Sequence, residues 1–124
     1  MTIKEAANKF GVSQDTLRYY ERVGAIPPVG RTAGGIRDYG EEDLKWINTA
    51  MCLRSAGVSI ESIVEYVKLF QQGEGTFEAR CALLSKEREG IIKQIEQLKE
   101  AVALLEYKIS RYEVAVKTGK LSWD

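Results

Sequence analysis

The residues best suited to a defined chemistry lie in one short stretch, residues 13–24, which reads SQDTLRYYERVG. Guanidinium, amide, hydroxyl and phenol groups are crowded there, and groups of these types contact phosphate oxygens and base edges. At helical spacing, Leu17, Tyr20 and Val23 share one side and can face a core. The polar side chains left on the outer side are Gln14, Thr16, Arg18, Tyr19 and Arg22.

The same stretch carries the signals of a short helix with sharp ends. Ser13 is a favoured N-cap, because its hydroxyl accepts a backbone N–H of the first turn. Val12 and Leu17 have the spacing of a hydrophobic staple. Gly24 supplies the left-handed stop. We therefore expect a helix that begins just after Ser13 and ends at Gly24.

A second helix is expected immediately before this stretch, over Thr2–Phe10. Thr2 and Glu5 have the spacing of a capping box, and apolar residues recur at helical intervals as far as Phe10. Gly11 then breaks the pattern. Helix, short turn and helix in this order predict a helix-turn-helix, in which the second helix is the reading element.

The segment after Pro27-Pro28 is expected to form a small wing. Val29–Arg31 and Ile36–Tyr39 are predicted as two short strands around the tight-turn pair Gly34-Gly35. The alternative is a surface loop with incidental arginines. The side chains that this wing would present are Arg31, Arg37 and Tyr39.

Charge is distributed unevenly, although the 124-residue chain has a formal net charge of zero. Residues 1–37 are net positive by three, residues 38–73 are net negative by three, and the remainder balances. A basic excess at one end is the electrostatic footprint expected of a nucleic-acid-binding surface.

Several other chemistries lack their residues. The chain has no histidine, the commonest acid–base group and metal ligand, and its two cysteines, Cys52 and Cys81, form no CxxC pair. We therefore expect no catalytic site, no metal and no cofactor. The N-terminus has no signal peptide and no apolar run approaches a membrane span, so a cytoplasmic location is expected.

Two supporting helices are expected after the wing. One begins near Gly40 and ends at Gly57, and the next begins after the N-cap Ser59. Cys52 would lie on the polar edge of the first of them, away from its apolar side. Residues 1–73 are thus predicted to form one domain, a winged helix-turn-helix with two supporting helices.

From Phe77 to Val116, residues at alternating intervals of four and three are apolar, with Arg88 as the one exception. Such a repeat predicts the seam of a coiled coil over residues 76–117, a rod of roughly 60 Å, followed by a short tail at 118–124. A second copy is the economical partner, since a lone rod has nothing to bury its seam against. The residues expected to carry dimerisation are Leu84, Ile91, Ile95, Leu98, Val102, Leu105 and Ile109.

These motifs together resemble the mercury-resistance-regulator (MerR) family of bacterial transcription regulators over essentially the whole chain. The resemblance lies in TIKEAANKFGVS, TLRYYERVGAIPP, RTAGGIRDY, EEDL and CLRSAGVSIESI, followed by the heptad helix. It implies a mainly α fold: a winged helix-turn-helix, then a long antiparallel coiled-coil dimerisation helix. The antiparallel direction comes from the resemblance alone, because heptads do not fix it.

The resemblance also implies roles for particular positions. Residues in the family's reading helix and wing typically touch phosphates and base edges. Tyr20 also fits the core, so its role is mixed. The positions carried over are Thr16, Arg18, Tyr19 and Tyr20 in the reading helix and Arg31, Arg37 and Tyr39 in the wing.

The chain departs from the family's metal sensors where their ligands lie. Those proteins place cysteines after the long helix, whereas this sequence reads LSWD there, and no large C-terminal ligand domain is expected. What remains resembles the branch with one cysteine in the helix after the wing, linked to electrophile and aldehyde responses. Cys52 matches that placement and is the expected sensor, with a small helix filler as the alternative. Cys81 is expected to be structural.

The expected function is therefore a transcription regulator that binds a dyad promoter operator in double-stranded DNA as a homodimer, and the resemblance implies that it activates by promoter distortion. RNA polymerase would be a partner indirectly, through the promoter, and no membrane partner is expected. The closest alternative is an architectural, excisionase-like DNA-binding protein without an effector. A coiled-coil adaptor and an enzyme are the other classes considered.

Overall fold

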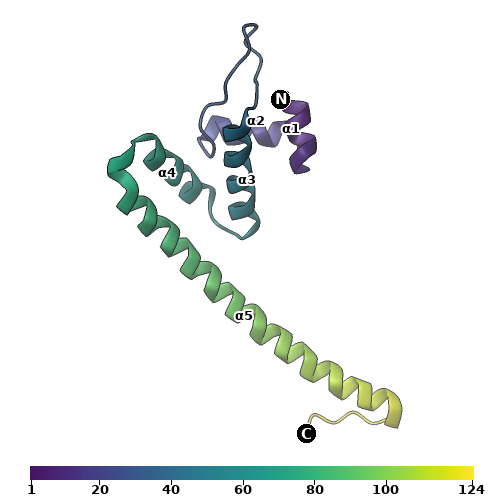
Figure 1. Ribbon diagram of the computed structural model, residues 1–124. Coiled ribbons are helices and arrows are strands. Elements are labelled where there is room, and N and C mark those ends of the chain that lie inside the picture. The colour runs from purple at the N-terminus through teal and green to yellow at the C-terminus, as the bar shows by residue number, and fades with distance from the viewer. The chain divides into compact units, whose positions relative to one another are not determined.

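The computed structural model describes all 124 residues and consists of helices joined by short turns and one longer loop. The helices are α1 (Ile3–Phe10), α2 (Gln14–Val23), α3 (Glu41–Ser55), α4 (Ile60–Gln71), the 3-10 helix η1 (Glu74–Thr76) and α5 (Phe77–Thr118) (Figure 1). The chain divides into two compact units, residues 1–87 and residues 88–124. None of the helices combines the length and hydropathy that crossing a membrane requires.

The predicted ends of α1 and α2 are confirmed. The Thr2 hydroxyl accepts the Glu5 N–H at 3.1 Å while the Glu5 carboxylate accepts the Thr2 N–H at 2.9 Å, which is a capping box. The Ser13 hydroxyl accepts the Thr16 N–H at 3.0 Å. Gly24 ends α2 at φ 85°, a left-handed conformation that favours glycine. α1 and α2 are thus the two helices of a helix-turn-helix.

Local signals also set the ends of α3 and α4. The Asp43 carboxylate accepts the Gly40 N–H at 2.8 Å at the start of α3. The Ser59 hydroxyl accepts the Ser62 N–H at 3.1 Å at the start of α4. Gly57, at φ 90°, lies in the turn between the two helices. The predicted helix boundaries at Gly40, Gly57 and Ser59 are therefore confirmed.

The core of the first unit draws buried side chains from α1, α2, α3 and α4 and from both ends of the loop between α2 and α3. Burial of apolar side chains from separate helices is the main force that holds such a small unit together. The buried residues are Ala6, Ala7, Leu17, Tyr20, Ala25, Ile26, Val29, Tyr39, Ile47, Ala50, Val58, Ile63 and Val67.

The loop between α2 and α3 is the predicted wing (residues 29–39), and it extends as a narrow hairpin-shaped loop (Figure 1). The prediction of two strands was wrong: the wing holds only an isolated antiparallel bridge between Arg31 and Arg37. The Gly35 N–H donates to the Thr32 carbonyl at 2.9 Å, and Gly35 has φ 82°. The tight turn at the glycine pair is therefore present, but the arms are too short for a ladder.

Arg80 fixes the junction between α4 and α5 within the first unit. Its Nε donates to the Thr76 hydroxyl at 2.8 Å and its Nη2 to the Gly73 carbonyl at 2.6 Å. Its guanidinium also lies over the rings of Phe70 and Phe77, 5.3 Å and 4.9 Å from their centroids. This contact set holds the first turn of α5 against the end of α4.

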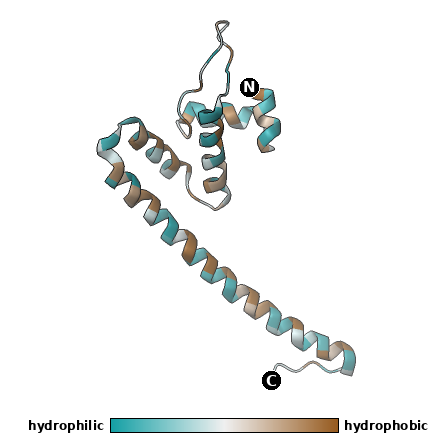
Figure 2. Cartoon of the chain, viewed as in Figure 1, coloured by the Kyte–Doolittle hydropathy of each residue, from teal (hydrophilic) through white to brown (hydrophobic).

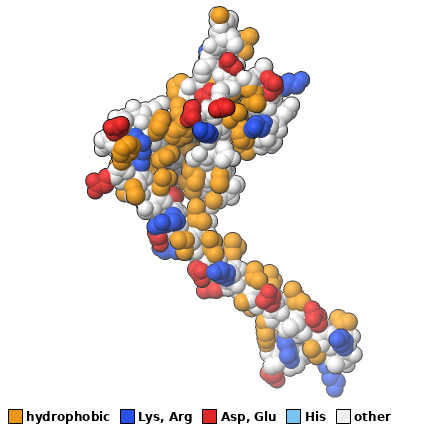
Figure 3. All heavy atoms as spheres, viewed as in Figure 1, with side chains coloured by type: hydrophobic (Ala, Val, Ile, Leu, Met, Phe, Trp, Pro, Cys, Tyr) orange, Lys and Arg blue, Asp and Glu red, His pale blue; other side chains and the backbone are white.

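α5 has no buried residue in the single chain. Large apolar side chains of the predicted seam remain open to solvent, and Figures 2 and 3 show hydrophobic residues along this helix. Between them lies an open groove of about 350 Å³ lined by apolar carbon from Ile95, Leu98 and Val102. An exposed stripe of this kind marks an interaction surface. Of the seven residues expected to carry dimerisation, the most exposed are Leu98, Val102, Leu105 and Ile109.

The C-terminal tail folds back along the last turns of α5. The Trp123 ring packs edge-on against Tyr112, 5.5 Å between centroids, and the Lys108 ammonium lies 4.6 Å from the Trp123 centroid. Arg111 Nε donates to the Ser122 carbonyl at 2.7 Å, and the Tyr107 hydroxyl donates to the Trp123 carbonyl. The tail is therefore anchored to the helix that it follows.

Candidate nucleic-acid interface

The outer face of α2 carries the donors expected of a reading helix. Arg18 is partly exposed, with Nη1 2.9 Å from Asp15 Oδ1 and Nη2 3.3 Å from Gln14 Oε1. Tyr19 is 38% exposed, and the Arg22 guanidinium lies 5.4 Å from its ring centroid. The burial of Leu17 on the opposite side of α2 holds this face outward.

Glu21 connects α2 to the wing. Its Oε1 accepts from Arg37 Nε at 2.7 Å and its Oε2 accepts the Val29 N–H at 3.0 Å. Both charged side chains are largely shielded, with 13% of the Glu21 side chain and 24% of the Arg37 side chain exposed. One carboxylate therefore bonds both arms of the wing, and it fixes the position of the wing relative to α2.

Glu21 ionises more readily than an ordinary glutamate. Burial works against its charge, but the hydrogen bonds from Arg37 and Val29 and the charges of Arg37 and Arg31 outweigh burial and lower its pKa. The ion pair between α2 and the wing is therefore intact at neutral pH.

The wing tip presents Arg31 and an apolar neighbour. Arg31 is exposed, and its Nη1 donates to the Gly35 carbonyl at 2.9 Å, which braces the turn. Ile36, next to that turn, is 65% exposed. Arg31 thus has no acidic partner, and its guanidinium is exposed beside the turn.

Two of the predicted DNA contacts are core residues. Tyr39 is 2% exposed and Tyr20 is 9% exposed, so neither ring is available on the surface. The direct-contact role predicted for Tyr39 is therefore corrected, and the mixed role of Tyr20 resolves toward the core. The wing's return arm alternates, which turns Arg37 and Tyr39 inward while Ile36 and Asp38 stay exposed. Burial raises the pKa of Tyr39, and its hydroxyl has no protein partner.

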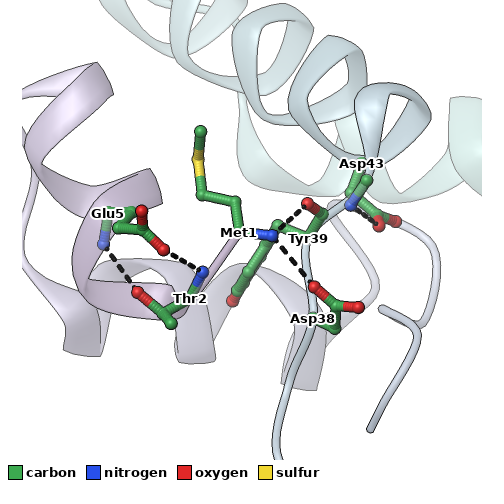
Figure 4. Close-up of polar contacts among 7 residues, drawn as sticks. Met1, Thr2, Glu5, Asp38, Tyr39 and Asp43 are labelled. Atoms are coloured by element: carbon green, nitrogen blue, oxygen red, sulfur yellow. Dashed lines mark hydrogen bonds and ion pairs between the residues drawn. The ribbon is translucent and has the colours of Figure 1, made fainter.

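The base of the wing is held by the start of the chain (Figure 4). The Tyr39 N–H donates to the Met1 carbonyl at 2.7 Å. The Met1 amine lies 2.9 Å from Asp38 Oδ1 and 3.1 Å from the Tyr39 carbonyl oxygen. These bonds join the segment before α1 to the end of the wing.

Sequence reasoning therefore found the exposed donors of α2 and Arg31 of the wing, but it missed the residues that position the wing. Glu21 and Met1 were not among the predicted site residues. The sequence held one signal for Glu21, because an acidic residue within the basic residues 1–37 indicates a structural partner. No sequence pattern indicated that Met1 would bond Tyr39.

The two cysteines are free and exposed in the single chain. Exposure of Cys52 on α3 agrees with the polar edge predicted for it. Lys45, the cation on that edge, pairs with Glu42 at 3.2 Å, so its charge is offset. Cys81 is exposed because the seam of α5, on which it lies, faces solvent in the single chain. No three histidine, cysteine or acidic side chains gather as a metal site would require.

Comparison with known proteins agrees with this geometry. The sequence pattern of the "MerR HTH family regulatory protein" group matches residues 1–69. The chain is 54% identical to the HTH-type transcriptional regulator AdhR of Bacillus subtilis over 75% of this chain and 66% of that protein. It is 35% identical to an uncharacterised HTH-type transcriptional regulator of Haemophilus influenzae, covering 97% and 89% of the two chains.

Two solved structures resemble the whole chain. One is a MerR family transcriptional regulator from Listeria monocytogenes, 45% identical, with a TM-score of 0.92 over 96% of this chain and 90% of that one. The other is HiNmlR, described as a MerR family regulator lacking the sensor domain, bound to promoter DNA. It is 35% identical, with a TM-score of 0.86 over 96% and 94% of the two chains. The chain belongs to the MerR family of helix-turn-helix transcription regulators.

Proposed function

We propose that two copies of this chain pair through α5 and bind a dyad-symmetric promoter operator. α2 of each copy enters the major groove, and each wing reaches the flanking backbone. The observation that carries this proposal is the Glu21–Arg37 pair, which joins an exposed reading helix to an arginine-tipped wing. The exposed seam of α5 supports the pairing of copies. The cytoplasm, where bacterial promoters lie, is the matching location.

A transcription regulator is favoured over an architectural, excisionase-like DNA-binding protein. The relatives reported above are described as transcription regulators, and HiNmlR is described as bound to promoter DNA without a sensor domain. The adaptor and enzyme alternatives receive no support from these relatives either.

Arg31→Ala and Arg18→Ala are expected to weaken operator binding in different ways. Arg31 contacts phosphate, so its loss should weaken binding to all sequences and reduce the salt slope by about one. Arg18 reads a base edge, so its loss should cost about 1–3 kcal/mol and relax specificity at one base pair. Mobility shift across a salt series measures both effects.

Lys68→Ala is the matched control for this experiment, because it removes one exposed positive charge from α4, which carries none of the proposed DNA contacts. Its operator affinity should stay close to that of the parent protein. Unchanged affinity in both arginine variants would remove α2 and the wing from the interface.

We further propose that the bound dimer activates by distorting the promoter, with RNA polymerase engaged through the reshaped DNA. Bending and untwisting the DNA between two gripped half-sites costs about 1–6 kcal/mol, which the added contacts offset. Inserting or deleting one or two base pairs between the promoter elements should therefore change transcription sharply in vitro. Output that ignores this spacing would argue for simple recruitment instead.

Cys52 is the proposed sensing thiol, with electrophiles and aldehydes as the effector class. Addition of its thiol across an aldehyde C=O forms a C–S bond and moves the thiol proton to oxygen, giving a hemithioacetal. The exposed position of Cys52 on α3 supports this role, since reactive cysteines must be accessible.

A Cys52→Ser variant should lose the promoter response to aldehyde or peroxide, while a Cys81→Ser variant keeps it. Promoter output in cells measures the response, and mass spectrometry of the treated protein locates the adduct. A full response from the Cys52 variant, or an adduct found on Cys81 alone, would move the sensing role elsewhere.

A further inference from the structure

Acidic residues are rare in residues 1–37, and each of them has a polar partner. Residues 1–37 contain only three acids, Glu5, Asp15 and Glu21. Glu5 caps α1 and Glu21 holds the wing. The one partner of Asp15 is Arg18, with Oδ1 2.9 Å from Nη1. Asp15 is thus the acid whose contact involves the proposed base-reading side chain itself.

The Asp15 contact is half of a fork that holds Arg18. Gln14 Oε1 lies 3.3 Å from Arg18 Nη2, so both terminal nitrogens of the guanidinium have an acceptor on the first turn of α2. The Arg18 side chain remains 43% exposed. A guanidinium has five N–H groups, so Nε and the second proton of each terminal nitrogen are still available to a ligand.

Helix stability alone is a weak reason for this acid. An exposed pair at i,i+3 contributes little to stability, Ser13 already caps α2, and the charge of this first-turn acid at the positive end of the helix adds only about 0.3–1 kcal/mol. The Asp15 side chain is 93% exposed on a surface that must approach phosphates, where a negative charge opposes binding. Its position is explained if it improves discrimination between sequences at the expense of general affinity.

We propose that Asp15, assisted by Gln14, is a specificity-determining residue that positions the Arg18 guanidinium for a guanine and weakens sequence-independent binding. Arginine reads guanine through two parallel hydrogen bonds to O6 and N7, which demand a fixed orientation of the guanidinium plane. The two acceptors supply that orientation before DNA arrives. The proposal rests on the proposed function, in which α2 reads the operator.

The test is the ratio of operator affinity to affinity for a scrambled duplex of equal length, with the operator selected from a random library by the parent protein. Asp15→Asn removes the charge and keeps the size of the side chain. We expect it to raise affinity for the scrambled duplex and to lower the ratio by about tenfold. Glu61→Gln, which neutralises an exposed acid of α4, is the charge-matched control and should leave the ratio unchanged.

An Arg18→Ala background separates positioning from direct reading. If Asp15 acts through Arg18, Asp15→Asn has no further effect on the ratio in that background. An equal fall in both backgrounds would mean that Asp15 reads a base itself, for example by accepting from a cytosine amino group, and would overturn the proposal. An unchanged ratio in the single variant would overturn it as well.

The same variants separate this proposal from the proposed function. If Arg18→Ala keeps full operator affinity, α2 does not bind the operator as proposed, and the role proposed for Asp15 is overturned as well. If Arg18→Ala loses affinity but Asp15→Asn keeps the ratio, only the role of Asp15 fails. Circular dichroism of each variant verifies that α2 stays folded.

Discussion

A chain with Ile95→Glu and Leu98→Glu is expected to be monomeric or unfolded and to lose operator binding. Both side chains line the apolar groove of α5 and are 45% and 66% exposed in the single chain. In a paired seam each glutamate becomes a charge buried without a partner, which costs several kcal/mol, comparable with the whole stability of a small domain.

Loss of pairing should be visible on DNA as well as in solution. A dimer that grips two half-sites binds through avidity, so a monomer should bind the full operator about 10²–10⁴-fold more weakly. Sedimentation gives the oligomeric state and mobility shift gives the affinity. A double variant that is folded, dimeric and fully active would contradict the role of the seam.

The control places two new carboxylates on the same helix, away from the seam. Gln97→Glu and Ser110→Glu fall at heptad positions that face outward when Ile95 occupies the seam. Both residues are exposed, and the Ser110 hydroxyl bonds only the Tyr107 carbonyl of its own helix. This variant should remain dimeric, so a difference between the two pairs is due to position rather than to charge.

The sequence predicted those features that depend on neighbouring residues. Thr2, Ser13 and Ser59 act as caps within three residues of their own positions, and Gly24 ends α2 through its own backbone conformation. The long helix α5 was also predictable, because a heptad repeat needs only spacing, whereas pairing through its apolar stripe stays a prediction. The direction of pairing stays a prediction, since no local residue determines it.

Contacts across long sequence separations were not readable in the same way. The Glu21–Arg37 pair spans 16 positions and the Tyr39–Met1 bond spans 38, so both depend on how the wing returns to the body. The burial of Tyr39 follows from that return. The strand prediction failed although the residue types fit, because the arms are short and form only a single bridge between Arg31 and Arg37.

Loss of the Glu21 carboxylate is expected to release the wing while α2 stays folded. Glu21→Ala would leave Arg37 and the Val29 N–H without their acceptor in a shielded place. We expect a loss of about 1–2 kcal/mol in unfolding free energy, discounted for the solvent that still reaches the pair. Operator affinity should also fall, because the position of Arg31 relative to α2 would no longer be fixed.

A double-mutant cycle with Arg37→Ala isolates the pair. If the two groups act through each other, the double variant should be about as destabilised as Glu21→Ala alone, because Arg37 has then already lost its partner. Additive losses would show that each residue acts separately. Asp38→Ala removes a different acid of the wing, exposed and bonded to the Met1 amine, and serves as the comparison.

Lowering the pH should release the wing of the parent protein, as Glu21→Ala does, because it protonates the Glu21 carboxylate. Because the folded state lowers the Glu21 pKa below its ordinary value of 4.5, the pair stabilises fully above that pH and is lost as pH falls through the folded pKa. NMR titration of the Glu21 carboxyl and the Val29 amide should therefore show a common midpoint below 4.5. In Glu21→Gln, the Val29 amide should no longer titrate with that midpoint. A Glu21 midpoint at or above the ordinary value would mean that the carboxylate does not hold the wing, and the wing would then need another anchor.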